Sequence, residues 1–264
     1  QALLSKTVRS HLISDVPIGV LLSGGVDSTA MLRYAAMHSS GPLNTFTIGF
    51  DDESVVDERP YARLASKKFG AKHHEITLTA KEFGELLPKY VWHMEEPVCE
   101  PPAIALFAVA RLARNSGVKV VLSGEGGDEA FGGYNKYGYL LALEKAKSLV
   151  GSSRKELLRL AMGAFAHMGM KSLRNYIPML DMALPDYYLS CTSSPFTPFN
   201  SNRRMLFNDA SLEELRAHNA RSPTREIFET SADLPALHQM LRVDTKTWLP
   251  DDLLIKADKM TMAT

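Results

Sequence analysis

An alternation of apolar runs and helical segments over the first half of the chain constrains the fold most strongly. The apolar stretches 16–22 (VPIGVLL) and 118–122 (VKVVL) each stop at a Ser-Gly turn, as buried parallel strands do. The other expected elements are strands at 43–50 and 72–78 and helices at 28–38, 57–69, 80–94 and 102–115. This β-α-β-α order predicts an α/β fold, a parallel twisted sheet with helices on both faces. Ligands of such sheets bind at the carboxyl ends of the strands, near the switch in strand order.

The second half of the chain lacks the strand pattern from about Gly138 onward. Helical periodicity is found at 140–150, 154–168, 212–219 and 237–249, with proline-rich and serine-rich connections between these segments. We therefore divide the chain into an α/β core at residues 1–137 and a mostly helical part of the same domain at residues 138–264.

The composition excludes several classes of function. The chain has 264 residues, with 30 Lys and Arg against 30 Asp and Glu, so its formal net charge is zero. A nucleic-acid surface needs an excess of positive charge on one face, and no apolar run reaches the ~20 residues that span a bilayer. We therefore expect neither a nucleic acid nor a membrane as partner. Cys99 and Cys191 are the only cysteines and form no disulfide framework or zinc site, which favours a cytoplasmic location.

Both ends of the chain have the character of internal sequence. The chain opens on Gln1 without an initiator Met, and it closes on DKMTMAT, which is typical of the middle of a helix. We therefore expect these residues to be a piece of a longer polypeptide.

A glycine-rich loop follows the first expected strand and precedes a helix. Residues 23–28 are Ser-Gly-Gly-Val-Asp-Ser. Gly24 and Gly25 lack side chains, so backbone N–H groups can approach a polyanion, and the helix N-terminus behind them adds positive potential. The loop is not the GxxxxGK[ST] loop of kinases and GTPases, because it has no Lys at the required place.

The polar side chains of this loop indicate a nucleotide with a metal ion. Ser23 and Ser28 offer hydroxyl groups to phosphate oxygens. Asp27 would repel a phosphate unless a cation lies between them, so we predict that it is a Mg²⁺ ligand. The alternative is a plain glycine turn in which Ser28 is the helix N-cap.

A second glycine-rich loop follows the last expected strand. Residues 122–134 are LSGEGGDEAFGGY, in which three carboxylates lie among five glycines. Asp128 is a candidate second ligand for the metal ion of Asp27, and Glu125 is a candidate general base or substrate-orienting carboxylate. The alternative is an acidic turn in which Glu129 favours the N-terminus of the next helix.

Together these motifs resemble a known family. LLSGGVDST resembles the pyrophosphate loop of the ATP-pyrophosphatases, which cleave ATP between the α- and β-phosphates. SGEGGDEAFGGY resembles a signature of the synthetase domain of the glutamine-dependent asparagine synthetase family. The resemblance extends over nearly the whole chain through FTIGF (46–50), MEEPVCEPPAI (94–104) and LPDDLLIKADKMTMA (249–263). It implies that the family's N-terminal glutaminase domain and its C-terminal stretch with a catalytic Lys lie outside these residues.

The resemblance implies a role for individual residues of this chain. Glu125 matches the carboxylate that helps to activate the nucleophile, and Asp27 and Asp128 match the metal ligands. The residues that match the ATP site are Ser23, Gly24, Gly25, Asp27 and Ser28 for pyrophosphate, Leu21 and Ile48 for the adenosine pocket, and Ser123 and Gly124 for backbone contacts to adenine and ribose.

The activity implied by the resemblance is that of a carbon–nitrogen ligase with glutamine as the nitrogen donor. A substrate carboxylate, aspartate in the family, would be adenylated by ATP with Mg²⁺, and ammonia from a glutaminase domain of the same polypeptide would then give asparagine, AMP and pyrophosphate. The resemblance also admits a homodimer.

Three other functions compete with this interpretation. An intramolecular cyclase such as a β-lactam synthetase uses the same adenylation chemistry, but such relatives tend to carry a Tyr-based dyad where this chain has Glu125. A non-enzymatic nucleotide sensor needs no such set of acids. A tRNA-modifying enzyme would be expected to have cysteine-rich or strongly basic regions, which the chain lacks.

Other residues are weaker candidates. Lys256 either supports the phosphate region or lies, with Lys259, on a solvated helix face. The sequence Glu95-Glu96-Pro97 favours a helix end over part of a substrate pocket. Trp92 and Trp248 are expected in the core.

Overall fold

The computed structural model describes residues 1–52, 54–95, 102–151, 155–193, 195–196, 202–217 and 223–264. Their contacts group them into two compact units. The first contains residues 1–127 and 251–264, and the second contains residues 128–250. These bounds differ from the predicted halves, because the last residues of the chain pack with the first unit. The domain division itself stays a prediction.

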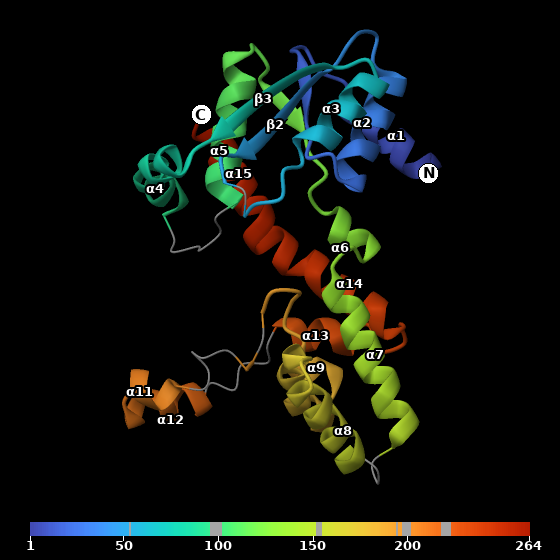
Figure 1. Ribbon diagram of the computed structural model, residues 1–264, viewed down its shortest axis with the longest axis vertical. Helices are drawn as coiled ribbons and strands as arrows, with labels where there is room; N and C mark the ends of the chain where they lie inside the picture. The colour runs from blue at the N-terminus through green and yellow to red at the C-terminus, as the bar shows by residue number, and fades with distance from the viewer. Residues whose placement is uncertain (53, 96–101, 152–154, 194, 197–201, 218–222) are drawn as a thin grey trace. The chain divides into compact units, whose positions relative to one another are not determined.

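A four-stranded parallel sheet organises the first unit (Figure 1). Its strands are β1 (Ile18–Leu21), β2 (Asn44–Phe50), β3 (Lys72–Leu78) and β4 (Val120–Leu122). Their order across the sheet is β3-β2-β1-β4, and all three neighbouring pairs are parallel. The predicted α/β class with a parallel sheet is therefore confirmed.

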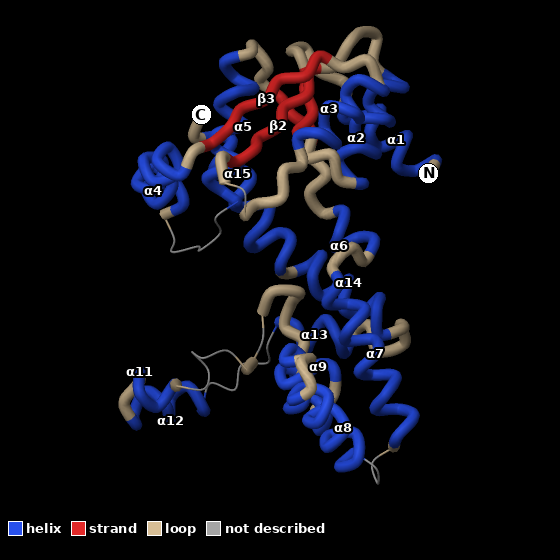
Figure 2. Tube along the Cα trace, in the orientation of Figure 1, coloured by secondary structure: helices blue, strands red, loops and turns tan. Residues whose placement is uncertain are grey.

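Helices cover both faces of this sheet (Figure 2). They are α1 (Ala2–His11), α2 (Val26–His38), α3 (Arg59–Lys68), α4 (Ala80–Met94), α5 (Pro102–Asn115) and α15 (Ile255–Met262). Val20 and Leu22 pack with α1, α2 and α3 on one face. Phe46 packs with α5 on the other face. This alternation along the strands is what a sheet buried on both sides requires.

Helix α4 shows local sequence signals that the fold obeys. The Thr79 hydroxyl accepts a hydrogen bond from the Glu82 N–H, and the Glu82 carboxylate accepts one from the Thr79 N–H, which forms a capping box. The helix ends at Glu95, which adopts a left-handed conformation with φ 62°. The prediction of a helix end at this point is confirmed for Glu95, while Glu96, Pro97 and Cys99 lie outside the described residues.

The prediction that Trp92 lies in the core is wrong. Helix α4 buries Leu86, Tyr90 and Met94, which recur at every fourth position. Trp92 lies between two of them on the opposite side of the helix, where 80% of it is exposed. Trp248 is partly buried.

The second unit is helical. Its elements are α6 (Gly127–Phe131, continuing from the first unit), α7 (Asn135–Val150), α8 (Lys155–His167), η2 (Lys171–Asn175), η3 (Ile177–Asp181), α9 (Leu184–Tyr187), α11 (Arg203–Leu206), α12 (Asp209–Ala217), α13 (Pro223–Glu229), α14 (Ala236–Lys246) and the π-helical turn η4 (Leu249–Leu254), which leads back to the first unit. The core of the second unit contains residues of α7, α8, η3, α9, α13 and α14 and the residue that follows α9, among them Tyr137, Tyr188, Phe228 and Met240. The predicted helical part is therefore confirmed.

Candidate active site

The strand order brings the two glycine loops to one edge of the sheet. Strand β1 pairs with β2 on one side and with β4 on the other, and both pairs are parallel. The chain therefore reverses its direction of travel across the sheet between β1 and β4, which is the place where open α/β sheets bind ligands. The loops that follow β1 and β4 leave the sheet at this point.

Gly24 has a backbone that only glycine adopts without strain. Its φ is 86°, and a Cβ atom here would lie 2.6 Å from the Ala62 backbone nitrogen and 2.7 Å from the Tyr61 Cβ atom. The start of α3 therefore packs directly on the loop. Both the conformation and the close approach explain why a glycine stands at this position.

The N-terminus of α2 has no side-chain cap. Gly25 is its N-cap residue, so the alternative with Ser28 as N-cap is wrong. Ser23 accepts a hydrogen bond from the Gly25 N–H at 3.2 Å, and the Ser23 and Ser28 hydroxyl oxygens lie 3.0 Å apart. Ser23 is exposed, whereas Ser28 is buried and also hydrogen-bonds the Gly25 carbonyl at 3.3 Å. The loop is thus held by its own serines, and the first N–H groups of a 13-residue helix face the edge of the sheet without a capping side chain.

The second loop packs with its backbone against the first turn of α2. A Cβ atom on Gly124 would lie 2.8 Å from the Ser28 nitrogen, and one on Gly127 would lie 2.5 Å from the Asp27 Cγ atom. Side chains at these two positions would separate the loops. The structure therefore brings both predicted motifs together and sets the Asp27 carboxylate against the backbone of the second loop.

The predicted adenosine residues lie on one face of the sheet. Leu21 and Ile48 are both partly buried and pack against the cluster that contains Phe46 and Val109. Thr47, the residue before Ile48 on β2, points to the opposite face of the sheet. Its hydroxyl donates a hydrogen bond to the carbonyl of Leu22, the residue immediately before the first loop. Ser123 accepts a hydrogen bond from the Glu125 N–H at 3.4 Å.

The three acids of the second loop have different surroundings. Glu125 is exposed in the first unit. Asp128 opens the second unit, where a Cβ atom on Gly133 would fall 1.8 Å from its Oδ1 atom. Glu129 is 1% exposed and accepts a hydrogen bond of 2.6 Å from the Tyr134 hydroxyl. Burial and this carboxylate raise the pKa of Tyr134. Glu129 lies in the first turn of α6, as the alternative interpretation expects, and its carboxylate is buried there.

The position of Arg59 was not predicted from the sequence. Its guanidinium lies over Gly49, where a Cβ atom would be 2.4 Å from Arg59 Nε. It donates two hydrogen bonds to Asp57 and one of 2.6 Å to the Thr77 hydroxyl. The hydrogen bonds from Arg59 lower the pKa of Asp57. A glycine inside an apolar strand, as at position 49, is the only signal that another group approaches the backbone there.

The lysines of α15 are not on a solvated face. Lys256 is 4% exposed. Lys259 donates to the Met94 carbonyl at 2.7 Å and to the Glu95 carboxylate at 3.2 Å, and thereby joins α15 to the end of α4. The interpretation as a solvated helix face is therefore wrong for Lys256.

Comparison with known proteins identifies the family of this chain. The family described as asparagine synthase matches residues 1–264. The chain belongs to the asparagine synthase family. Within the ranges that the structure describes, no helix is both long and apolar enough to cross a membrane.

Relatives in this family carry related names. "Asparagine synthetase [glutamine-hydrolyzing] 1" of Bacillus subtilis is 34% identical over 97% of this chain and 39% of its own length. "Asparagine synthetase B [glutamine-hydrolyzing]" of Escherichia coli is 31% identical over 69% of this chain and 35% of its own length. "Amidase chyE" of Penicillium rubens is 31% identical over 51% of this chain. The chain thus spans 39% and 35% of the length of these two asparagine synthetases.

Proposed function

We propose that this chain is the ATP-using part of a glutamine-dependent asparagine synthetase. The observation that carries the proposal is the contact between the two glycine loops. Gly124 and Gly127 let the second loop approach the first turn of α2 at the switch point of the sheet. Such an arrangement suits a polyphosphate, which the backbone N–H groups and the positive end of the helix stabilise together.

The loop at 23–28 would bind the pyrophosphate portion of ATP. The exposed Ser23 hydroxyl and the first N–H groups of α2 are the donors, and Gly24 keeps side chains out of the way. Ser28 holds the loop in shape through its hydrogen bonds to Ser23 and Gly25 and offers its N–H group. Leu21 and Ile48 would contact the adenosine, with Ser123 and Gly124 offering backbone groups to adenine and ribose.

The donor set fits a Mg²⁺ ion that the nucleotide brings with it. No cluster of three His, Cys, Asp or Glu side chains suited to a metal occurs in the described part of the chain. Mg²⁺ commonly takes one or two carboxylates together with substrate phosphates and waters. Asp27 supplies one carboxylate beside the phosphate loop, and Asp128 would supply the second. The ion would neutralise the phosphate charge that Asp27 otherwise repels.

The proposed reaction has two steps. A substrate carboxylate oxygen attacks the α-phosphorus of ATP, the bond to the bridging oxygen breaks, and pyrophosphate leaves. Ammonia then attacks the acyl carbon, AMP leaves, and the nitrogen loses a proton. Glu125 is exposed on the second loop and is the group that would accept this proton or hold the nucleophile in line. The main catalytic effects are positioning and charge neutralisation.

Aspartate is the proposed acid, and ammonia released from glutamine is the proposed nucleophile. The names of the Bacillus and Escherichia relatives support both. A glutaminase domain of the same polypeptide would release the ammonia. We place the enzyme in the cytoplasm, with a homodimer as its assembly.

A second candidate differs only in the acceptor. The relative named an amidase is 31% identical over 147 residues, so related chains carry names outside asparagine synthesis. The loops described above serve any adenylation, and an acid other than aspartate, or an intramolecular amine, would use them equally well.

A pyrophosphate-release assay tests the proposal. The full-length protein, with the C-terminal stretch expected to carry the catalytic Lys, is given Mg·ATP and ammonium with aspartate, glutamate or no acid. Pyrophosphate release that depends on aspartate supports asparagine synthesis, and release with another acid only would favour the second candidate.

Calorimetry with Mg·ATP and with ATP in EDTA tests the metal. Asp27→Asn should weaken Mg·ATP binding by about 1–3 kcal/mol, the range for losing an interaction with a charged group. Asp15→Asn, at an exposed position before β1, is the matched control. Equal affinity with and without Mg²⁺ would contradict the metal assignment.

A further inference from the structure

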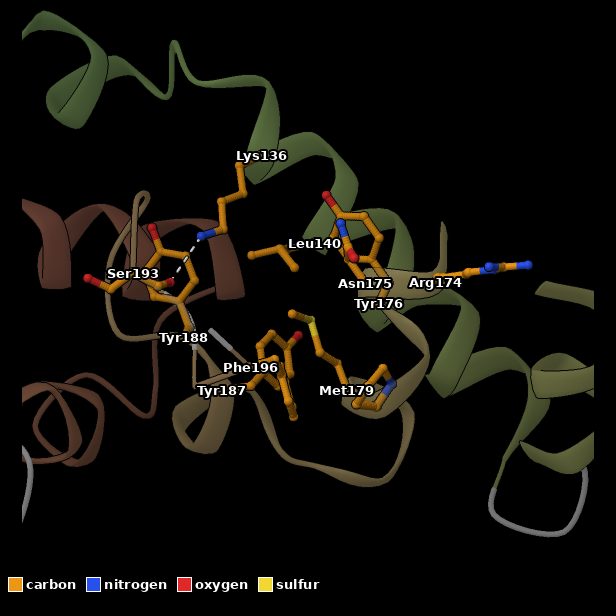
Figure 3. Close-up of a pocket in the computed structure, with 11 residues that line it drawn as sticks. Lys136, Leu140, Arg174, Asn175, Tyr176, Met179, Tyr187, Tyr188, Ser193 and Phe196 are labelled. Carbon is orange, nitrogen blue, oxygen red and sulfur yellow. Dashed lines mark hydrogen bonds between the residues drawn. The ribbon is translucent and has the colours of Figure 1, made fainter. Parts of the chain in front are cut away.

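The helical unit contains a cavity that the proposed synthesis does not use. Its volume is about 500 Å³, within the range of small-molecule sites. Figure 3 shows Lys136 and Leu140 reaching into it from one side, with Tyr187, Tyr188 and Met179 on the other. All of its described lining residues belong to the second unit.

Buried side chains of the core form part of the cavity wall. Leu140, Met179, Tyr187 and Tyr188 are all buried members of the core of this unit. The Tyr187 hydroxyl donates to Glu144 at 2.7 Å, and the Tyr188 hydroxyl donates to Asp244. Because the two hydroxyls are already paired, these two side chains line the cavity mainly with their carbon atoms. Such a surface suits a flat apolar group.

The charge in the cavity comes from Lys136. Its amine donates to the Ser190 and Ser193 carbonyls, both at 3.2 Å, and lies 5.9 Å from the centre of the Tyr188 ring. Two of its three N–H groups are therefore used by neutral acceptors. Among the described residues, no carboxylate lies within 4.0 Å of this amine, and no Asp or Glu lines the cavity. Burial lowers the pKa of Lys136, and Cys191 and Asp244 oppose this shift without reversing it.

The other cation of the lining is directed elsewhere. Arg174 extends away from the remaining side chains in Figure 3, and its guanidinium lies 3.3 Å from His167 Nδ1. Lys136 is therefore the group on which an anion inside the cavity would be held.

We propose that this cavity binds a small organic carboxylate with a flat apolar body. The carboxylate would accept the third N–H of Lys136, and the body would lie against Leu140, Met179 and Tyr188. The ligand would supply a carboxylate in direct contact with the amine, which no described Asp or Glu does, and its apolar part would leave water. This binding site goes beyond the proposed synthesis and does not depend on ATP.

A matched pair of probes tests the proposal on the unmodified protein. 1-Naphthylacetate and 1-naphthylacetamide share one shape and differ in the charge of the head group. Calorimetry should show the acid binding at least about 10-fold more tightly than the amide, because a charge-assisted hydrogen bond is worth more than a neutral one. Equal affinity, or no binding of the acid, would overturn the proposal.

Variants identify the cation. Lys136→Met should remove the preference for the acid, and Lys136→Arg should retain it. Arg174→Gln is the matched control and should leave both affinities unchanged. If Lys136→Met keeps the preference, or if Arg174→Gln loses it, the assignment is wrong and Lys136 serves only to hold the Ser190 and Ser193 carbonyls. Should Lys136→Met fail to fold, the probe pair on the unmodified protein still decides.

Discussion

The two units use polar groups in opposite ways. At the loops of the first unit, glycines expose backbone N–H groups of α2 that no side chain caps. In the second unit, Asp244 is 0% exposed and its carboxylate accepts hydrogen bonds from Tyr137 at 2.6 Å, from Tyr188, and from the Cys191 N–H at 3.0 Å. The first region leaves donors for a ligand, whereas the second satisfies its polar groups internally.

The loops of the first unit are therefore expected to contribute to ligand binding, and the buried cluster of the second unit to the stability of the fold. A donor that waits for a ligand adds little to the stability of the free protein, because water satisfies it in the folded and unfolded states alike. A buried carboxylate with three donors connects α7, α14 and the segment after α9. Removal of the carboxylate leaves its buried donors without a hydrogen-bond partner. Substitutions in the loops should therefore change ATP binding, and substitutions around Asp244 should change stability.

The largest effect is expected at Asp244. Asp244→Ala leaves two tyrosine hydroxyls and one N–H buried without their acceptor, so the free energy of unfolding should fall by about 3–5 kcal/mol. Asp244→Asn keeps the shape and one acceptor oxygen, and it should cost less. Urea denaturation followed by circular dichroism measures both.

The matched control is Asp186→Ala, which removes an exposed ion pair with Arg225 and should cost less than about 1 kcal/mol. If Asp244→Ala were as stable as this control, the buried cluster would not hold the helices together. If it abolished ATP binding without loss of stability, the division of roles between the two regions would fail.

Gly24→Ala should have the largest effect on ATP binding. A left-handed backbone costs a non-glycine residue about 1–2 kcal/mol. The new methyl group would also lie 2.6 Å from the Ala62 nitrogen, so the loop must shift. Calorimetry should show ATP affinity reduced at least about 10-fold, the equivalent of 1.4 kcal/mol.

Gly41→Ala serves as control, because its Cβ atom would meet nothing within 4 Å and its φ is not positive. It should bind ATP like the unmodified protein. Unchanged ATP affinity in Gly24→Ala would show that the geometry of this loop does not matter to the nucleotide.

The same difference explains how much the sequence predicted. The loop at 23–28 lies within six residues, directly between a strand and a helix, so its position followed from local pattern alone. Strand β3 and helices α4 and α5 were predicted with their observed bounds for the same reason, because Thr79 and the apolar spacing mark them locally. The contact of Gly127 with Asp27 was not predicted, since it joins residues 100 positions apart.

The cluster around Asp244 gave no sequence signal. Tyr137 and Tyr188 lie 107 and 56 residues from Asp244 in sequence. An Asp in an amphipathic helix is usually exposed, and only the tertiary packing shows that this one is buried. The prediction that Trp92 lies in the core was wrong for the converse reason, since an aromatic side chain is buried only if it lies on the packed side of its helix.

A change at Glu125 should distinguish catalysis by the second loop from ATP binding by the first loop. Glu125→Gln keeps the shape of the side chain and removes its charge. ATP affinity should stay nearly unchanged, while amide formation should fall at least about 10²-fold, the usual scale for a positioned acid–base group. Glu58→Gln, an exposed acid before α3, is the control. A loss of ATP binding with an unchanged rate at saturation would move Glu125 into the nucleotide site.

The smallest expected effect is a difference in pH dependence between the two units. Burial lowers the pKa of His73 and of His74 on β3 below the ordinary value of 6.5, and Lys72 lowers that of His74 further. Glu75 opposes the shift at His73 without reversing it. As the pH falls through 6.5, the unfolded chain takes up protons that the folded sheet does not, so the sheet loses stability.

Asp244 responds with the opposite sign. Burial raises its pKa above 3.8, so the folded helical unit binds a proton at a higher pH than the unfolded chain does. Its contribution to stability therefore rises as the pH falls and is lost as the pH rises through the folded pKa.

Hydrogen exchange between pH 7 and pH 5, corrected for the intrinsic rate, should show weaker protection of peptides from β3 but not of peptides from α14. His73→Gln with His74→Gln should flatten the response of β3, and His238→Gln, at an exposed position, should not. If β3 keeps its protection at pH 5, burial of these imidazoles does not govern the stability of the sheet, and the two units do not differ in this respect.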